Sequence, residues 1–122
     1  MVYRRIGTTW SAETTFVVPC GADGDAIGAS VALSSDGTRA IIGAPLASTT
    51  TGPRVGNVWS LALRGGAWSV DALLRGSNGS PDETFGAPVA ISGDGSLALA
   101  AGGGFGPTPG SDNRVLAFAL RP

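Results

Sequence analysis

The feature that most constrains this chain is an internal duplication. Residues 27–41 and the segment 58 positions later share eight identical residues out of fifteen. The identical residues of the first copy are Gly28, Ala29, Val31, Ala32, Ser34, Asp36, Gly37 and Ala40. The register extends back to Trp10, which matches Trp68, and to Asp25, which matches Glu83. Repeats of this kind are typical of architectures in which each unit buries its apolar face against a neighbouring unit.

Each unit is predicted to form four short β-strands. In the first unit we expect them at Ser30–Leu33, Arg39–Ala44, Val55–Leu63 and Trp68–Leu74. The segments "SSDG" and "SGDG" separate the first two strands of the two units, and Asp-Gly between apolar runs favours a hairpin because glycine accepts positive φ without steric cost. No segment has a convincing helical stripe. Four antiparallel strands per repeat predict an all-β fold made of propeller blades, whereas a β-sandwich, the alternative, does not require a duplication.

The repeated segment also resembles a known family. "IGASVALSSDGTRAIIGAP" is similar to the FG-GAP repeat of integrin α-chain propellers, and more closely to its short bacterial version. The Phe-Gly of the family corresponds to Ile27-Gly28 and to Phe85-Gly86, and its Gly-Ala-Pro to residues 43–45. In the second unit that triplet is replaced by Ala-Gly-Gly at residues 101–103. The resemblance covers nearly the whole chain and implies a β-propeller.

The resemblance implies one propeller segment over residues 1–122, with about two 58-residue repeats. Residues 2–18 correspond to strands three and four of a preceding blade, residues 28–75 to a complete blade, and residues 86–120 to a blade that lacks its fourth strand. Known propellers have about four to eight blades. We therefore expect the partner to be other propeller segments. They are either two or three further copies of this chain, closing an oligomeric ring of six or eight blades, or the remainder of a longer chain.

The sequence contains no recognisable catalytic set, cofactor motif or metal site. The chain has no histidine and a single cysteine, Cys20, which leaves zinc and a Ser-His-Asp triad without ligands. Many repeats of the family carry a calcium loop in the first hairpin, but the ligand positions before Asp36 fall on Ala32 and Ser34. One carboxylate per loop is too few for calcium. Asp36 and Asp94 are interpreted as turn residues that bond to their own backbone.

Three acidic residues and the tryptophans are the remaining candidates. Asp23, Asp25 and Glu83 are weak candidates for ligand binding, and the repetition of an acid before Ile-Gly and Phe-Gly suggests a local task such as accepting backbone N–H groups. Because Trp10 and Trp68 are equivalent, we expect both to pack between neighbouring blades. The third tryptophan, Trp59, is matched by Leu116, a replacement typical of a core.

These observations favour a non-catalytic binding, adhesion or scaffold module rather than an enzyme. The net charge of −1 and the scattered arginines exclude a basic surface for nucleic acid, and no apolar run is long enough to span a membrane. The alternatives are a structural piece of a larger assembly, or a fragment of a propeller enzyme or lectin whose functional residues lie elsewhere. By resemblance, we expect an extracellular or cell-surface location and a protein or glycan ligand.

Overall fold

A computed structural model describes residues 1–19, 21–76, 81–103 and 114–121. Cys20 and most of the glycine-rich segment after residue 102 lie outside these ranges. The described part is all-β, with nine strands and no helix. The strands are β1 (Val2–Ile6), β2 (Thr9–Thr14), β3 (Ser30–Leu33), β4 (Arg39–Ala44), β5 (Asn57–Arg64), β6 (Ala67–Leu74), β7 (Val89–Ile91), β8 (Leu97–Gly102) and β9 (Arg114–Ala119).

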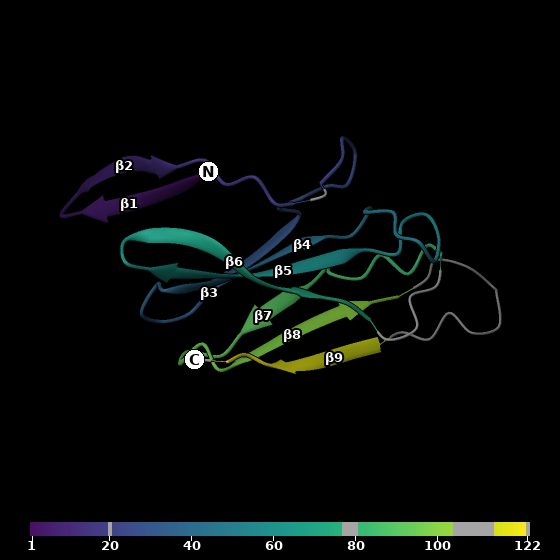
Figure 1. Ribbon diagram of the computed structural model, residues 1–122. Coiled ribbons are helices and arrows are strands. Elements are labelled where there is room, and N and C mark those ends of the chain that lie inside the picture. Colours follow the sequence, from purple (N-terminus) through teal and green to yellow (C-terminus); the bar gives the residue numbers. More distant parts are fainter. Residues whose placement is uncertain (20, 77–80, 104–113, 122) are drawn as a thin grey trace.

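The strands form three antiparallel sheets, in each of which neighbours in space are also neighbours in sequence. We call β1–β2 the N-terminal hairpin, β3–β4–β5–β6 the central sheet and β7–β8–β9 the C-terminal sheet. Figure 1 shows them stacked in this order, with the central sheet between the other two. The all-β class predicted from the sequence is therefore confirmed, and the described residues do not by themselves form a closed ring.

The strand predictions for the first unit are confirmed with small shifts. β3 and β4 have the predicted bounds, while β5 begins at Asn57 instead of Val55 and β6 begins one residue earlier than expected. Gly56 has a φ of +92°, a backbone conformation outside the β region, so the strand starts after it. The two strands expected within residues 2–18 end at Thr14, and the chain then leaves the hairpin so that Val18 is buried beside Trp59.

The two repeats are built with the same strand registers. Val31 lies opposite Ile42 in the central sheet, and Val89 lies opposite Ala100, 58 residues later, in the C-terminal sheet. The pairing of Ile42 with Trp59 recurs as the pairing of Ala100 with Leu116. The duplication in sequence is thus also a duplication of hydrogen-bonded structure, shortened by one residue before β9.

The N-terminal hairpin repeats the last two strands of the central sheet. Arg5 lies opposite Trp10 in the hairpin, as Leu63 lies opposite Trp68 in the central sheet. Both pairs of strands also shift register at the same position, between Val2 and Tyr3 and between Ser60 and Leu61. A shared irregularity of this kind makes β2 the structural counterpart of β6.

The main core lies between the central and C-terminal sheets. Its buried members are Ile41, Val58, Leu74, Phe85, Ala98, Ala100 and Leu120. The other face of the central sheet buries Trp59 with Val18 and Ala47 near the loops. Because both of its faces are covered, β5 is buried at six successive residues, Asn57 to Ala62, rather than at alternate ones. No helix in the described ranges is long and apolar enough to cross a membrane.

Candidate functional site

The loops before β3, between β4 and β5, and before β7 lie together at one end of the sheets, opposite the Asp-Gly turns (Figure 1). We call residues 21–29, 45–56 and 81–88 the loop end. The first two loops are joined because the Leu46 N–H donates to the Asp25 carbonyl at 3.2 Å. The Gly56 N–H donates to the Ala47 carbonyl at 2.9 Å, which closes the second loop on itself. The loops therefore form one hydrogen-bonded layer.

The second and third loops are joined by a ladder of three backbone hydrogen bonds. The N–H groups of Asp82, Thr84 and Phe85 donate to the carbonyls of residues 53, 54 and 55 at 3.0, 3.0 and 2.9 Å. These bonds cross from the central sheet to the C-terminal sheet. They tie the two loops together at three successive carbonyls, as the hydrogen bonds between two short strands do.

Left-handed backbone is concentrated in this layer. Within the described ranges, the non-glycine residues with positive φ are Ala26, Arg54, Asp82 and Thr84, at +57°, +50°, +63° and +51°. All four belong to the loop end. Such conformations are costly and persist where the surrounding structure imposes them, which often marks a binding or catalytic surface.

The layer is anchored on the core by Phe85 and Gly86. Phe85 is fully buried, and its ring meets that of Phe118 edge to face, with centroids 6.3 Å apart. The Gly86 carbonyl accepts a hydrogen bond from the Ser30 hydroxyl at 2.6 Å. A β-carbon at Gly43 would overlap that same carbonyl oxygen, so the close approach of the two sheets requires glycine there. The Phe-Gly pair thus fixes the loop end to both sheets.

The three acids predicted from the sequence differ in their surroundings. Asp23 is exposed at the loop end, while Asp25 and Glu83 are buried at equivalent positions before β3 and β7. The Asp25 carboxylate accepts a hydrogen bond from the Ala22 N–H at 2.9 Å, which is the local task expected of it. In the described part of the chain, no three acidic or cysteine side chains gather in a way that could hold a metal ion.

One exposed ion pair at the loop end was missed by sequence reasoning. The Arg54 Nε lies 2.5 Å from the Asp82 Oδ1, and both side chains are about half exposed. The hydrogen bond and the charge of Asp82 raise the pKa of the Arg54 guanidinium. The two residues are 28 positions apart, so no local pattern links them.

The opposite end holds the Asp-Gly turns, which confirm their predicted role. The Asp36 carboxylate accepts hydrogen bonds from the Ser34 hydroxyl and from both the N–H and the hydroxyl of Thr38. Asp94 has the same three donors on Ser92 and Ser96. The Ser92 hydroxyl first, and then the Ser96 groups, lower the pKa of Asp94 to about 2. One oxygen of each carboxylate is thus already used by the turn.

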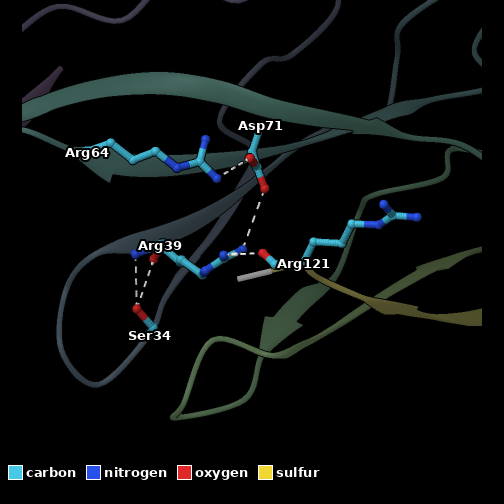
Figure 2. A network of polar contacts seen from close by, with 5 residues as sticks. All are labelled: Ser34, Arg39, Arg64, Asp71 and Arg121. Atoms are coloured by element: carbon cyan, nitrogen blue, oxygen red, sulfur yellow. Dashed lines mark hydrogen bonds and ion pairs between the residues drawn. The ribbon is translucent and has the colours of Figure 1, made fainter.

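A polar network beside these turns joins the central sheet to the end of the C-terminal sheet (Figure 2). Asp71 accepts from Arg64 at 2.7 Å and lies 3.5 Å from an Arg39 nitrogen. Arg39 also donates to the Arg121 carbonyl, and its backbone N–H donates to the Ser34 hydroxyl at 3.0 Å. The network is mostly shielded from solvent at Asp71 and Arg39. Its bonds tie three strands and the chain end together.

An apolar cleft of about 220 Å³ opens between the N-terminal hairpin and the central sheet. Its walls include Tyr3 and Phe16 on one side and Val31, Leu33 and Ile42 on the other. Trp68 also lines the cleft and is half-buried, as expected for a packing residue.

The expectation that Trp10 packs between blades is wrong in this structure, because its side chain is 64 % exposed. Trp10 lies on the hairpin, where no described strand covers it from outside. Trp59 is buried, as its match with Leu116 predicted.

Comparison with known proteins adds no relative to this geometry. The chain matches no protein-family model and none of the curated proteins compared with it.

Proposed function

We propose that the chain is a segment of a β-propeller of the FG-GAP type and acts as a non-catalytic binding or adhesion module. The proposal places the ligand surface at the loop end. The resemblance of the sequence supports the propeller, as do the equal registers of the two repeats. The resemblance also supports an extracellular or cell-surface location and a protein or glycan as ligand.

The observation that carries the proposal is the hydrogen-bonded loop layer. Its ladder of backbone hydrogen bonds and its four left-handed residues hold the loops in one shape before any partner arrives. Loops that are already ordered lose little conformational entropy when a partner binds, so a preformed surface binds more tightly. Loops on a rigid sheet scaffold are the usual place for recognition residues. Arg54 and Asp82 present opposite charges on this surface, and Asp23 adds a third exposed polar side chain.

The test compares two charge-removing double variants in a glycan array and a cell-adhesion assay on coated surfaces. Arg54→Ala with Asp82→Ala alters the loop end, and Arg4→Ala with Glu13→Ala alters an exposed ion pair on the N-terminal hairpin. Each change should cost the fold little, because exposed ion pairs contribute little to stability. We expect the wild type and the hairpin variant to bind and the loop-end variant to lose binding. No binding by the wild type in either assay, or equal losses in the two variants, would refute the proposal.

The second candidate function is a structural piece of a larger assembly. It is favoured by the apolar cleft of about 220 Å³ beside the N-terminal hairpin, because a finished sheet stack is close-packed and leaves no void of that size. A fragment of a lectin would bind a sugar at the loop end, and a fragment of a propeller enzyme would convert one there. The glycan array separates the lectin from a protein-binding module, and an assay with chromogenic glycosides detects the enzyme.

A further inference from the structure

The outer face of the C-terminal sheet is apolar and uncovered within the described residues. Leu97, Leu99 and Val115 on this face are 42 %, 39 % and 69 % exposed. The alternation of β7, β8 and β9 places only small apolar side chains beside them, at Ala90, Ala117 and Ala119. β9 is also an edge strand, since its described partner is β8 alone. An apolar face next to an unpaired edge is a docking surface.

The repeat identifies what covers such a face. The register makes Leu99 the counterpart of Ile41 and Val115 the counterpart of Val58. Ile41 and Val58 are buried in the central sheet against the C-terminal sheet. The contact between the two sheets therefore joins unlike faces. The face of the central sheet that carries Ile41 and Val58 packs against the face of the C-terminal sheet that carries Ala98 and Ala100. An interface between unlike faces can be repeated along a stack or around a ring.

The N-terminal hairpin and its cleft form the matching half of this interface. The cleft is lined by Val31, Leu33, Ala40 and Ile42 of the central sheet. Their counterparts in the C-terminal sheet are Val89, Ile91, Ala98 and Ala100, the residues that pack on the central sheet. The hairpin covers only part of this face. The cleft is the space that the first two strands of a preceding sheet would fill.

We propose that a second copy of this chain fills the cleft. The C-terminal sheet of one copy docks on the central sheet of the next, with Leu97 and Leu99 entering the cleft. β2 of the next copy then pairs with β9 instead of with β1, and so becomes the fourth strand of the C-terminal sheet. The inference rests on the propeller architecture proposed above but not on any ligand of the loop end.

The charges across the new strand pair are complementary. In the central sheet, Arg64 on β5 bonds to Asp71 on β6 at 2.7 Å. The repeat counterparts of these two residues are Arg121, just after β9, and Glu13 on β2. Glu13 now bonds to Arg4 of the hairpin. In the assembled sheet, Arg121 of one copy takes the place of Arg4, so the carboxylate of Glu13 keeps an arginine partner.

β1 is held mainly by its pairing with β2 and by the ion pair of Arg4 with Glu13, and the exchange replaces both. Met1 and Ile6 are each 70 % exposed, and most of the hairpin is open to solvent. A two-stranded hairpin is only marginally stable in water. Pairing β2 with β9 restores the backbone hydrogen bonds that β1 gives up, and it buries the outer face of the C-terminal sheet in addition.

The equivalence also fixes the register of the new pair. Because Ala62 lies opposite Ser69 in the central sheet, Ala119 of one copy should lie opposite Ser11 of the next. Within one chain, the hairpin and the C-terminal sheet are separated by the central sheet (Figure 1). A disulfide between positions 119 and 11 must therefore join two copies.

The experiment measures mass by light scattering and disulfide formation on non-reducing gels, in the 122-residue chain, with Cys20→Ser added in the two disulfide variants. We expect the wild type to have a mass of several times 12.1 kDa. Ala119→Cys with Ser11→Cys should give disulfide-linked ladders, while Ala119→Cys with Ala12→Cys, whose side chain points to the other face, should not. Leu99→Glu should weaken association at least about tenfold, and Ile6→Glu on the released strand should not.

A wild-type mass of 12.1 kDa at every concentration would overturn the proposal and assign the face to a segment outside these residues. An oligomer insensitive to Leu99→Glu, or crosslinking equal in the two cysteine pairs, would also overturn it. Circular dichroism of Leu99→Glu confirms that its sheets remain. The ligand assays on the loop-end variant are independent of this result, so the two proposals fail separately.

Discussion

Replacing Phe85 by alanine tests whether the Phe-Gly pair anchors the two sheets to each other. Phe85 is 1 % exposed and belongs to the main core, where it contacts Phe118 edge to face at an interplanar angle of 67°. Removing a fully buried phenylalanine costs about 3–5 kcal/mol, because the transfer free energy is lost and a cavity is left. About 1 kcal/mol of that sum is the aromatic pair itself.

The repeat provides a matched control at the same motif position. Ile27 is the counterpart of Phe85 but remains 42 % exposed before β3. Because much of its side chain already contacts water, Ile27→Ala should cost only about 1 kcal/mol. The comparison separates burial between the sheets from the motif position alone.

The assay is urea denaturation followed by tryptophan fluorescence, since Trp59 is buried in the folded state. We expect the midpoint of Phe85→Ala to fall well below that of Ile27→Ala with similar m-values, which would indicate a change in stability rather than in the denatured state. Equal losses in the two variants, or a loss under about 1 kcal/mol for Phe85→Ala, would show that the sheets are not anchored through this ring.

Three further outcomes are expected. The pKa of Asp94 is lowered to about 2 from 3.8, so its contribution to stability is complete above about pH 5 and is lost as the pH falls toward 2; urea titrations in this range should show a smaller pH dependence for Asp94→Asn. Gly43→Ala should cost about 3 kcal/mol by overpacking against the Gly86 carbonyl, and Gly7→Ala, with open space around it, only about 1 kcal/mol in the same assay. Neither calcium nor a chelator should change the melting temperature by more than about 1 °C, because one carboxylate per loop is too few to bind calcium. A calcium ion bound to the folded state would raise the melting temperature.

The strands and turns could be predicted because their signals are local. Asp36-Gly37 sets the hairpin between β3 and β4, and the duplication transfers that hairpin to the second repeat without further information. The start of β5 could not be placed from composition. Val55 favours a strand, but the left-handed conformation of Gly56 interrupts it, and that conformation depends on the contact with the Phe85 backbone.

Burial of individual side chains was harder to predict than the strands. Trp10 and Trp68 are equivalent in sequence, yet one is exposed and the other half-buried, because burial depends on which sheet lies alongside. The hydrogen bond on Asp25 follows from its position in a tight loop. The pair of Arg54 and Asp82 does not, since only the packing of two sheets brings it together.

The edge position of β9 also has a consequence for solubility. Residues 115–120 are an unbroken run of six apolar residues without proline, a composition that favours cross-β stacking when a strand edge is accessible. Arg114 and Arg121 stand at the two ends of the run. In a fibril of aligned copies, both arginines would stack on their own images at a spacing of about 4.8 Å, and like charges at that distance repel. The flanking arginines therefore act as gatekeepers, which disfavour fibrils of aligned identical strands at an edge that remains able to pair with a different strand.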